Sequence, residues 1–506
     1  MSLSAPTEDE LTAVANELGL PITHSDLKIF HSIISQRLKR FDQLLALGEE
    51  HLEWTAPARH YHWPSVAENP YGAWFCRSRI QTAADGPLAG LSVTIKDNIA
   101  VAGLPMLDGL PAEELTLSNE DATVVRRLLA AGATIAGKTH CEMLCCSSGS
   151  HTSASGPVLN PRNPRHMTGG SSSGSAAAVA AGDVDIAIGT DQAGSCRIPA
   201  AACGVIGIKP TYGLIPYTGA LGSELTIDHL GILSRSVVAN AKTLSAVAGA
   251  DGLDSRQSGQ VSSDYARAID EPLQGLRIAR LAEGFSLPGQ DDRIGPIVQR
   301  AIDWLQTFGH TLVETSVPEH RQAPVIYSGV FYEGAVRRWR GGLGTFPSGR
   351  GRYLTALPEA FSLRNPGELA ETVQLALLMG SYIIRRYPGK LYGTAQNLIP
   401  WLTRAYDEQF ERFHLLAMPT ITNLPPEFPL GNVDTQRSLE IGHGNIGNTV
   451  PFNLTGHPAI SIPCGTLDGL PVGLMLVAPK NEEALLYRVA RIFEQENPDT
   501  RTWLSN

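Results

Sequence analysis

Two serines in glycine-rich turns and one lysine are the residues whose types and spacing could do chemistry. Ser171 lies in the run Thr-Gly-Gly-Ser-Ser-Ser-Gly-Ser at 168–175, and Ser195 lies 24 positions later in a second turn. Glycine tolerates dihedrals that other residues avoid, so such turns let backbone N–H groups approach a ligand closely. A serine hydroxyl becomes a nucleophile when a base takes its proton. Lys96, at the end of an apolar strand, is a candidate for that base.

The first turn on its own fits other uses as well. A phosphate loop of the form G-x-x-x-x-G-K-[ST] is excluded, because no lysine lies between residues 139 and 208. Residues 170–174 match the G-x-S-x-G elbow, with Ser172 as nucleophile. That elbow follows a strand, whereas residues 160–167 hold two prolines and no β-type run. An ordinary helix N-terminus stays open as the structural alternative, since serine and glycine are common caps.

Taken together, several ordered motifs resemble the amidase signature enzymes over roughly residues 70–500. They are Lys-Asp-Asn at 96–98, the Gly/Ser run at 169–175, Gly-Thr-Asp-Gln-Ala-Gly-Ser-Cys-Arg-Ile-Pro at 189–199, Gly-Ile-Lys-Pro-Thr-Tyr-Gly at 207–213 and Asn-Leu-Thr-Gly-His-Pro-Ala at 453–459. The resemblance implies a Ser–cis-Ser–Lys triad. In it, Ser195 is the nucleophile, Ser171 the bridging serine on a cis peptide and Lys96 the base.

The implied triad is chemically coherent. Ser171 can accept one hydrogen bond and donate another, so it can relay a proton between Ser195 and Lys96. A lysine acts as a base only when it is neutral, and burial without a nearby carboxylate lowers its pKa. The alternative for Lys96 is a solvated strand end that pairs with Asp97.

The resemblance also assigns roles to the turn before Ser195. The backbone N–H groups of Gln192, Ala193 and Gly194 are implied as donors to the oxyanion of a tetrahedral intermediate, although most relatives have glycine in place of Ala193. Asp191 and Arg197 are expected to pair beneath this loop and support it. The alternative is an exposed ion pair, which contributes little.

A cysteine-containing loop is placed by the resemblance beside the acyl pocket. The candidate substrate-binding residues are Cys145, Cys146, Ser147 and Ser172, with Ser148 on the same loop. A rival hypothesis makes Cys145 or Cys146 the nucleophile of a nitrilase-like Glu-Lys-Cys set, with Glu142 and Lys138 close in the sequence. Nitrilase-like enzymes lack the Gly/Ser signature, which disfavours this hypothesis.

Histidines and aromatic residues are expected outside the chemistry. The triad needs no histidine, so His229, His443 and His457 are interpreted as structural. The aromatic residues at 327–339 are expected in the core or in the wall of a substrate channel.

Strands and helices alternate around the candidate residues. The strand ending at Lys96, a helix at 122–132 and a strand at 133–138 predict a βαβ unit, which favours a parallel sheet. A helix at 174–181 and a strand at 184–188 continue the pattern, while Thr7 and Glu10 fit a capping box that opens a helical segment. We expect an α/β protein: a helical N-terminal extension (1–75) and one large α/β/α catalytic domain (76–506) around a mixed, mostly parallel twisted sheet.

Composition narrows the class of protein. A formal net charge of -10 argues against non-specific nucleic-acid binding. No signal peptide and no apolar run long enough for a membrane span is found. Seven cysteines, without a C-x-x-C pair and with Cys145 and Cys146 adjacent, suit neither a disulfide framework nor a zinc site. We expect a cytoplasmic protein that needs no metal or cofactor and forms a homodimer.

The expected function is hydrolysis of the C–N bond of a small carboxamide through an acyl-serine intermediate. Hydrolysis of related carbamates, hydrazides, ureas or esters stays open, because all pass through a similar oxyanion. A second alternative is the glutaminase subunit of a tRNA-dependent amidotransferase, which has the same catalytic core.

Overall fold

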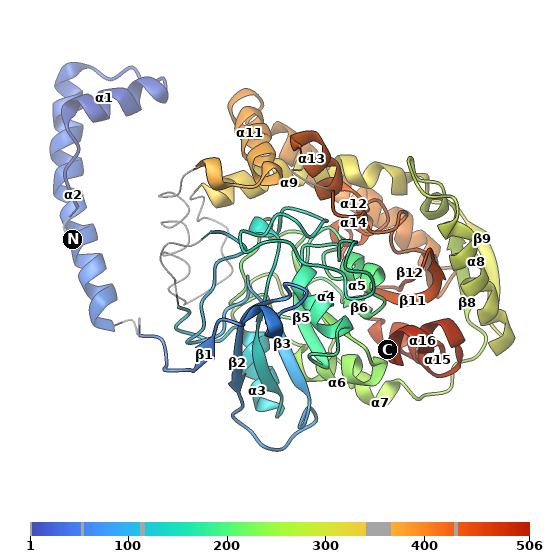
Figure 1. Ribbon diagram of the computed structural model, residues 1–506. Coiled ribbons are helices and arrows are strands. Elements are labelled where there is room, and N and C mark those ends of the chain that lie inside the picture. The colour runs from blue at the N-terminus through green and yellow to red at the C-terminus, as the bar shows by residue number, and fades with distance from the viewer. Residues whose placement is uncertain (1–2, 52–54, 112–116, 341–365, 430–433, 506) are drawn as a thin grey trace. The chain divides into compact units, whose positions relative to one another are not determined.

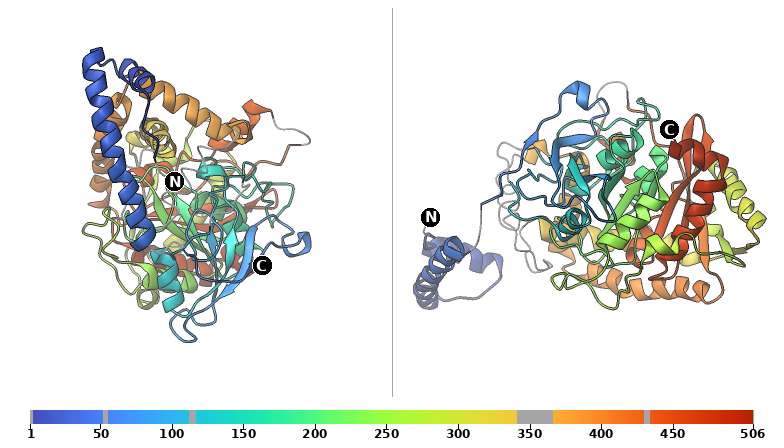
Figure 2. Two further views of the ribbon diagram at one scale, coloured as in Figure 1. Left: turned by 90° about the vertical axis from the view of Figure 1, so that its left-hand side faces the viewer. Right: turned by 90° about the horizontal axis from the view of Figure 1, so that it is seen from below.

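Two helices form a unit of their own at the start of the chain (Figures 1 and 2). The computed structural model describes residues 3–51, 55–111, 117–340, 366–429 and 434–505. The first unit, Met1–Ala56, holds α1 (Glu8–Glu17) and α2 (His24–His51). The capping box of Thr7 and Glu10 is confirmed. The second unit is Pro57–Asn506, so the predicted boundary between residues 75 and 76 falls inside it.

One sheet of described strands runs through the second unit, in the order β1-β2-β4-β3-β5-β7-β6-β11-β12-β10-β8-β9. Figure 1 shows this order running from β1 and β2 past β5 and β6 to β8 and β9. The strands are β1 (Tyr61–His62), β2 (Trp74–Ile80), β3 (Ser92–Lys96), β4 (Thr134–Thr139), β5 (Ile186–Asp191), β6 (Ile206–Lys209), β7 (His229–Ser234), β8 (Arg277–Leu281), β9 (Thr311–Thr315), β10 (Leu415–Pro419), β11 (Ala459–Leu467) and β12 (Leu470–Val477).

The sheet is mixed, as predicted, but the expectation that it is mostly parallel is wrong. Only β3–β4, β3–β5, β8–β10 and β8–β9 are parallel among the described strands. Parallel neighbours need a crossover, and α3 (Thr123–Ala130) and α8 (Ile294–Trp304) supply it for β3–β4 and β8–β9. The centre, β5-β7-β6-β11-β12, is antiparallel throughout. The predicted βαβ unit is therefore confirmed for β3, α3 and β4, but parallel pairing does not continue through the centre of the sheet.

Helices cover both faces of the sheet, and β5 shows this best. Successive side chains of a strand point to opposite faces. Ile186 and Ile188 belong to the main core, together with the buried residues of α3 and of α6 (Val237–Val247). Ala187 belongs to a second cluster with α4 (Ser173–Ala180) and α5 (Arg197–Cys203). The α/β/α arrangement is thus confirmed.

The remaining helices complete the layers and add a cap. Helices α9, α11, α12 and α13 lie together in Figure 1, and α9 contacts α11, α12 and α14. Among the described helices, none combines the length and the apolar character that crossing a membrane requires. The helices not yet given bounds are α7 (Tyr265–Ala268), α9 (Ala323–Trp339), α11 (Glu371–Arg386), α12 (Lys390–Phe410), α13 (Thr435–His443), α14 (Val450–Leu454), α15 (Glu483–Glu496) and α16 (Pro498–Ser505).

Neighbouring parallel strands bring the candidate residues to one edge. Lys96 is the last residue of β3, and Asp191 is the last residue of β5. Because β3 and β5 are parallel neighbours, their carboxyl ends meet at the same edge of the sheet. Ligands of open α/β sheets bind at such edges.

Candidate active site

Lys96 and Ser171 meet in the interior, although they are 75 residues apart in the chain. The Lys96 Nζ donates a hydrogen bond of 2.8 Å to the Ser171 Oγ and one of 2.8 Å to the Thr190 Oγ1. All three side chains are buried, and the peptide bond between Gly170 and Ser171 is cis. Thr190 was not predicted as a partner of Lys96, although it lies in the motif 189–199, at the same edge of the sheet as Lys96. The lysine is therefore held by two hydroxyl groups, one of them the predicted relay.

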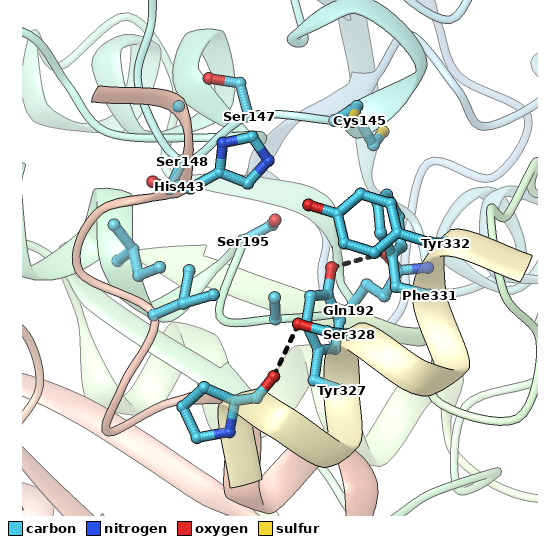
Figure 3. Close-up of a pocket in the computed structure, with 16 residues that line it drawn as sticks. Cys145, Ser147, Ser148, Gln192, Ser195, Tyr327, Ser328, Phe331, Tyr332 and His443 are labelled. Carbon is cyan, nitrogen blue, oxygen red and sulfur yellow. Dashed lines mark hydrogen bonds between the residues drawn. The ribbon is translucent and has the colours of Figure 1, made fainter. Parts of the chain in front are cut away.

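Ser195 opens onto a cavity of about 240 Å³ (Figure 3). Its turn is joined to the first one by the Ser172 N–H, which donates to the Ser195 carbonyl over 3.2 Å. Among the described residues, the Ser195 hydroxyl forms no hydrogen bond, either to Ser171 or to any other group. It is therefore free to contact a substrate in the cavity. Catalytic hydrogen bonds are often long without substrate and tighten when it binds.

Cysteine sulfurs near Lys96 affect its pKa. Burial lowers the pKa of Lys96, but negative charge on the neighbouring cysteine sulfurs, with Cys145 first among them, raises it, and the net direction is upward. The Cys145 Sγ lies 3.9 Å from the Thr190 Oγ1, and the pKa of Cys145 is lowered to about 5 by the neighbouring Cys141 side chain and by the Lys96 charge. The expectation that burial would lower the pKa of Lys96 and keep it neutral is therefore wrong, because the sequence did not place these sulfurs beside it.

The alternatives for Lys96 and for a cysteine nucleophile do not match the contacts. Asp97 pairs with Lys138 over 3.2 Å rather than with Lys96. Lys138 also donates to the carbonyls of Asp97 and Pro105, each over 2.8 Å. The Glu142 carboxylate accepts from the backbone N–H groups of residues 151 and 152. Glu142 and Lys138 are thus both engaged outside the cavity, and a Glu-Lys-Cys set is not assembled.

Asp191 supports the turn that carries Ser195. Its carboxylate accepts from the N–H groups of Gly194 (3.0 Å) and Cys196 (3.1 Å), from the Arg197 guanidinium (2.9 Å) and from the Asn453 amide (2.8 Å). Burial raises the pKa of Asp191, but the Arg197 charge and these hydrogen bonds hold it below its ordinary value. The ion pair of Asp191 and Arg197 is fully buried, as predicted, and removing one partner of such a pair costs about 3–5 kcal/mol.

The three predicted oxyanion donors differ in whether their N–H groups already have an acceptor in the protein. The Gly194 N–H donates to Asp191 and is not free for a substrate, which corrects the expectation for this residue. Gly194 has a φ of 122°, and a side chain here would collide with Thr449. No protein acceptor is found for the Gln192 and Ala193 N–H groups within the described part of the chain. The Ala193 carbonyl accepts from the Thr449 hydroxyl over 2.5 Å, which fixes this peptide.

A buried carboxyl group anchors the Gln192 side chain. The Gln192 Nε2 donates to the Asp228 Oδ1 over 2.7 Å, and the Tyr327 hydroxyl donates to the Gln192 Oε1 over 3.4 Å. The other Asp228 oxygen accepts from the Glu224 N–H over 3.1 Å. Burial raises the pKa of Asp228 to about 7. No local sequence pattern links residue 228 to residue 192, so this contact could not be predicted from the sequence.

The cavity wall combines predicted and unexpected residues. Cys145, Cys146, Ser147 and Ser148 line it, whereas Ser172 does not, since its hydroxyl donates to the Thr190 carbonyl in the interior. The aromatic residues of α9 form one wall, as Figure 3 shows, which agrees with the channel-wall expectation. The lining residues that sequence analysis did not place here are Ile198, Pro324, Ser328, Gly442, His443 and Ile446.

The three histidines have different surroundings. His457 is buried and hydrogen-bonds to Asp407 over 2.9 Å, and His229 is buried beside Asn453. Only His443 of these three lines the cavity, and one of its ring nitrogens is 2.9 Å from the Leu439 carbonyl in the same helix.

Comparison with known proteins adds independent findings. Residues 76–487 match the family described as Amidase. The chain is 39% identical over 501 residues to an enantioselective amidase of Rhodococcus rhodochrous, covering 97% of this chain and 95% of that one. It is 36% identical over 431 residues to one subunit of the glutamyl-tRNA(Gln) amidotransferase of Halobacterium salinarum, covering 84% and 99%. The fold is similar to that of a 6-aminohexanoate cyclic dimer hydrolase, with a TM-score of 0.71, 26% identity and coverage of 83% and 87%.

Proposed function

This chain belongs to the amidase family and hydrolyses C–N amide bonds, and on that premise we propose that it cleaves small neutral carboxamides through an acyl-Ser195 intermediate. The observation that carries the proposal is the hydrogen bond of 2.8 Å between Lys96 and Ser171, beside a cavity onto which Ser195 opens.

The proposed acylation begins when the Ser195 Oγ attacks the amide carbon. Its proton passes to Ser171, and the Ser171 proton passes to Lys96, which must first release its own proton because its pKa lies above the ordinary value. The carbonyl π electrons move to oxygen, and the free N–H groups of Gln192 and Ala193 are the candidates to stabilise the oxyanion. Each such donor contributes about 2.7–4 kcal/mol to the transition state.

The same relay then runs in reverse. Lys96 returns its proton through Ser171 to the amide nitrogen, the C–N bond breaks, and ammonia or an amine leaves. In deacylation a water molecule gives its proton to the relay and attacks the acyl-Ser195 ester. The carboxylic acid leaves and Ser195 regains its proton, so the atoms and charges balance over the cycle.

The cavity lining supports a neutral substrate. No Asp, Glu, Lys or Arg lines it among the described residues, and its walls include Ile198, Ile446 and the α9 aromatic residues. Ionic groups need partners when they leave water, so a charged substrate would be poorly bound here. The uncharged lining disfavours the glutaminase alternative, because free glutamine carries an ammonium and a carboxylate. Carbamates, hydrazides, ureas and esters of similar shape stay within the proposal as related substrates.

A substrate panel tests the proposal. Purified enzyme is assayed for release of ammonia or amine from primary amides, anilides, carbamates, hydrazides and glutamine. We expect the highest kcat/KM with an uncharged amide and little turnover of glutamine. Preference for glutamine, or co-purification of a second polypeptide that is needed for activity, would favour the amidotransferase alternative.

The proposed place of action is the cytoplasm. All seven cysteines are free thiols, Cys141 and Cys145 among them. Disulfides are rare in reducing compartments, so free thiols at this number are consistent with a cytoplasmic enzyme.

A further inference from the structure

Two thiols and a carboxyl group come together behind the cavity wall. Asp108 follows β3, Cys141 follows β4, and Cys145 ends the short 3-10 helix Met143–Cys145. One ligand atom from each of the three residues lies within 4.8 Å of the other two. The Cys145 Sγ is 3.4 Å from the Asp108 Oδ1, and the Cys141 Sγ is 4.0 Å from the same oxygen.

These distances suit ligands of one tetrahedral metal ion. A zinc–sulfur bond is about 2.3 Å and a zinc–oxygen bond about 2.0–2.2 Å, so two ligands of one tetrahedral ion lie roughly 3.5–3.8 Å apart. The two measured separations are within a few tenths of an ångström of that range. Small side-chain adjustments would therefore be enough for both sulfurs and the carboxylate to share one ion.

The Asp108 carboxyl group is poorly compensated for a buried group. Its side-chain hydrogen bonds within the described residues come from the Cys141 and Cys145 thiols, which are weak donors. Lys96 is the nearby cation, but its ammonium donates to Ser171 and Thr190. Buried charges are ordinarily paired or bound to metals, so a cation between the two sulfurs would be favourable for Asp108.

The cluster is reached through the catalytic cavity. Cys145 lines the cavity, as Figure 3 shows, while Asp108 and Cys141 lie behind it and are buried. An ion that enters the cavity would meet the Cys145 sulfur first, and the cavity side leaves room for water as a fourth ligand.

We propose that Asp108, Cys141 and Cys145 form a binding site for a thiophilic divalent cation such as Zn²⁺ or Cd²⁺, and that its occupation inhibits hydrolysis. Both sulfurs bind as thiolates, so a metal–sulfur bond replaces each S–H bond that is present before binding, and its proton leaves to solvent. The bound ion and its water ligand then occupy the Cys145 side of the cavity that Ser195 also lines, and they exclude the substrate from it.

Cadmium binding to the full chain tests the site without any catalysis. Reduced enzyme, stripped of metal, is titrated with Cd²⁺ while the ultraviolet sulfur-to-cadmium charge-transfer band is recorded. We expect one tightly bound ion per chain. Loss of an outer-shell group alone weakens metal binding about 10–100-fold, so Cys141→Ser, Cys145→Ser and Asp108→Asn should each weaken it by at least about tenfold.

A matched control separates this site from general thiol binding. Cys203 is another fully buried free thiol, in the second core cluster, and Cys203→Ser should bind Cd²⁺ like the wild type. Circular dichroism checks that each variant folds, and Cys141→Ala replaces Cys141→Ser if the latter does not. No charge-transfer band in the wild type, or equal loss in Cys203→Ser, would overturn the site.

The inhibition is tested against each variant's own activity without metal. At a Cd²⁺ concentration that halves wild-type turnover, Cys141→Ser should keep most of its activity. Equal inhibition of both proteins would refute the inhibitory role. Because binding is measured optically, a failure of this site is distinguishable from a failure of the proposed amidase mechanism.

Discussion

Among the single residues, Ser171 has the most specific proposed role, which is to relay a proton between Ser195 and Lys96. It accepts a hydrogen bond from Lys96 over 2.8 Å and lies next to the turn that carries Ser195. A group in this place can pass a proton in both directions, to the base during attack and to the leaving nitrogen during C–N cleavage. The second transfer matters most for poor leaving groups such as amines.

Ser171→Ala should therefore lower amide hydrolysis more than ester hydrolysis. An alkoxide leaving group needs less help from a proton donor, and general acid–base catalysis is typically worth about 100- to 10,000-fold. The measurement is kcat/KM for an amide and an ester with the same acyl group. Ser172→Ala is the matched control, since Ser172 is buried and outside the cavity. Equal losses on both substrates would refute the relay.

Sequence motifs indicated the two serines and Lys96 as candidates because each lies in a short pattern of its own, and the structure brings Lys96 and Ser171 into contact. They could not predict Thr190 as a partner of Lys96, nor the thiols that raise the pKa of Lys96. Those contacts depend on how three segments meet after folding. The predicted role of the Gly194 N–H as an oxyanion donor is wrong for a similar reason, because this N–H donates a hydrogen bond to the Asp191 carboxylate.

Among the elements, the turn after β5 is held from both sides. The ion pair of Asp191 and Arg197 lies beneath the turn and supports its backbone. Asp228, just before β7, accepts a hydrogen bond from the Gln192 side chain and holds it in place. β5 and β7 are antiparallel neighbours, and Asp191 pairs with His229, which explains why residue 228 reaches residue 192. The sequence indicated the strand near 184–188 but not its antiparallel partner, because such pairing leaves no local signal.

Asp228 should make the enzyme less stable as the pH rises. Burial raises its pKa to about 7 in the fold, against about 3.9 in an unfolded chain. Between about pH 4 and 7 the folded protein therefore holds a proton that the unfolded chain has released, and the free energy of unfolding falls across this window.

Asp228→Asn removes this titration. The variant should lose some stability at every pH, because an amide offers one acceptor fewer to Gln192 and Glu224. Its free energy of unfolding should nevertheless fall less than that of the wild type between pH 5 and 8, measured by urea unfolding. Asp291→Asn, at a partly exposed carboxyl group whose pKa is lowered by Arg293, should keep the wild-type dependence. An unchanged pH dependence in Asp228→Asn would contradict the raised pKa.

At the scale of the whole molecule, the N-terminal unit, taken by itself, leaves apolar side chains of α2 unpacked. Along α2, Phe30 (47% exposed), Ile33 (40%), Phe41 (52%) and Leu44 (60%) recur at helical spacing on one face. An exposed apolar stripe of this kind is typical of an interaction surface. The homodimer expected from the sequence stays a prediction, and this face is where we expect a second copy to bind.

Phe30→Ser combined with Phe41→Ser should convert the dimer to a monomer. The measurement is size-exclusion chromatography with light scattering, and Gln43→Ser on the same helix is the control. Because the catalytic residues lie in the second unit, specific activity should change little in the double variant. A monomeric wild type, or a double variant that stays dimeric, would contradict this prediction.

The identity of the nucleophile is the central claim, and covalent labelling tests it most directly. The enzyme is treated with a serine-directed fluorophosphonate and digested, and the labelled peptide is sequenced by mass spectrometry. We predict one label per chain on Ser195, no label in Ser195→Ala, and normal labelling in Ser172→Ala. A label on Ser171, Ser172 or Cys145, or equal labelling of Ser195→Ala, would contradict the account.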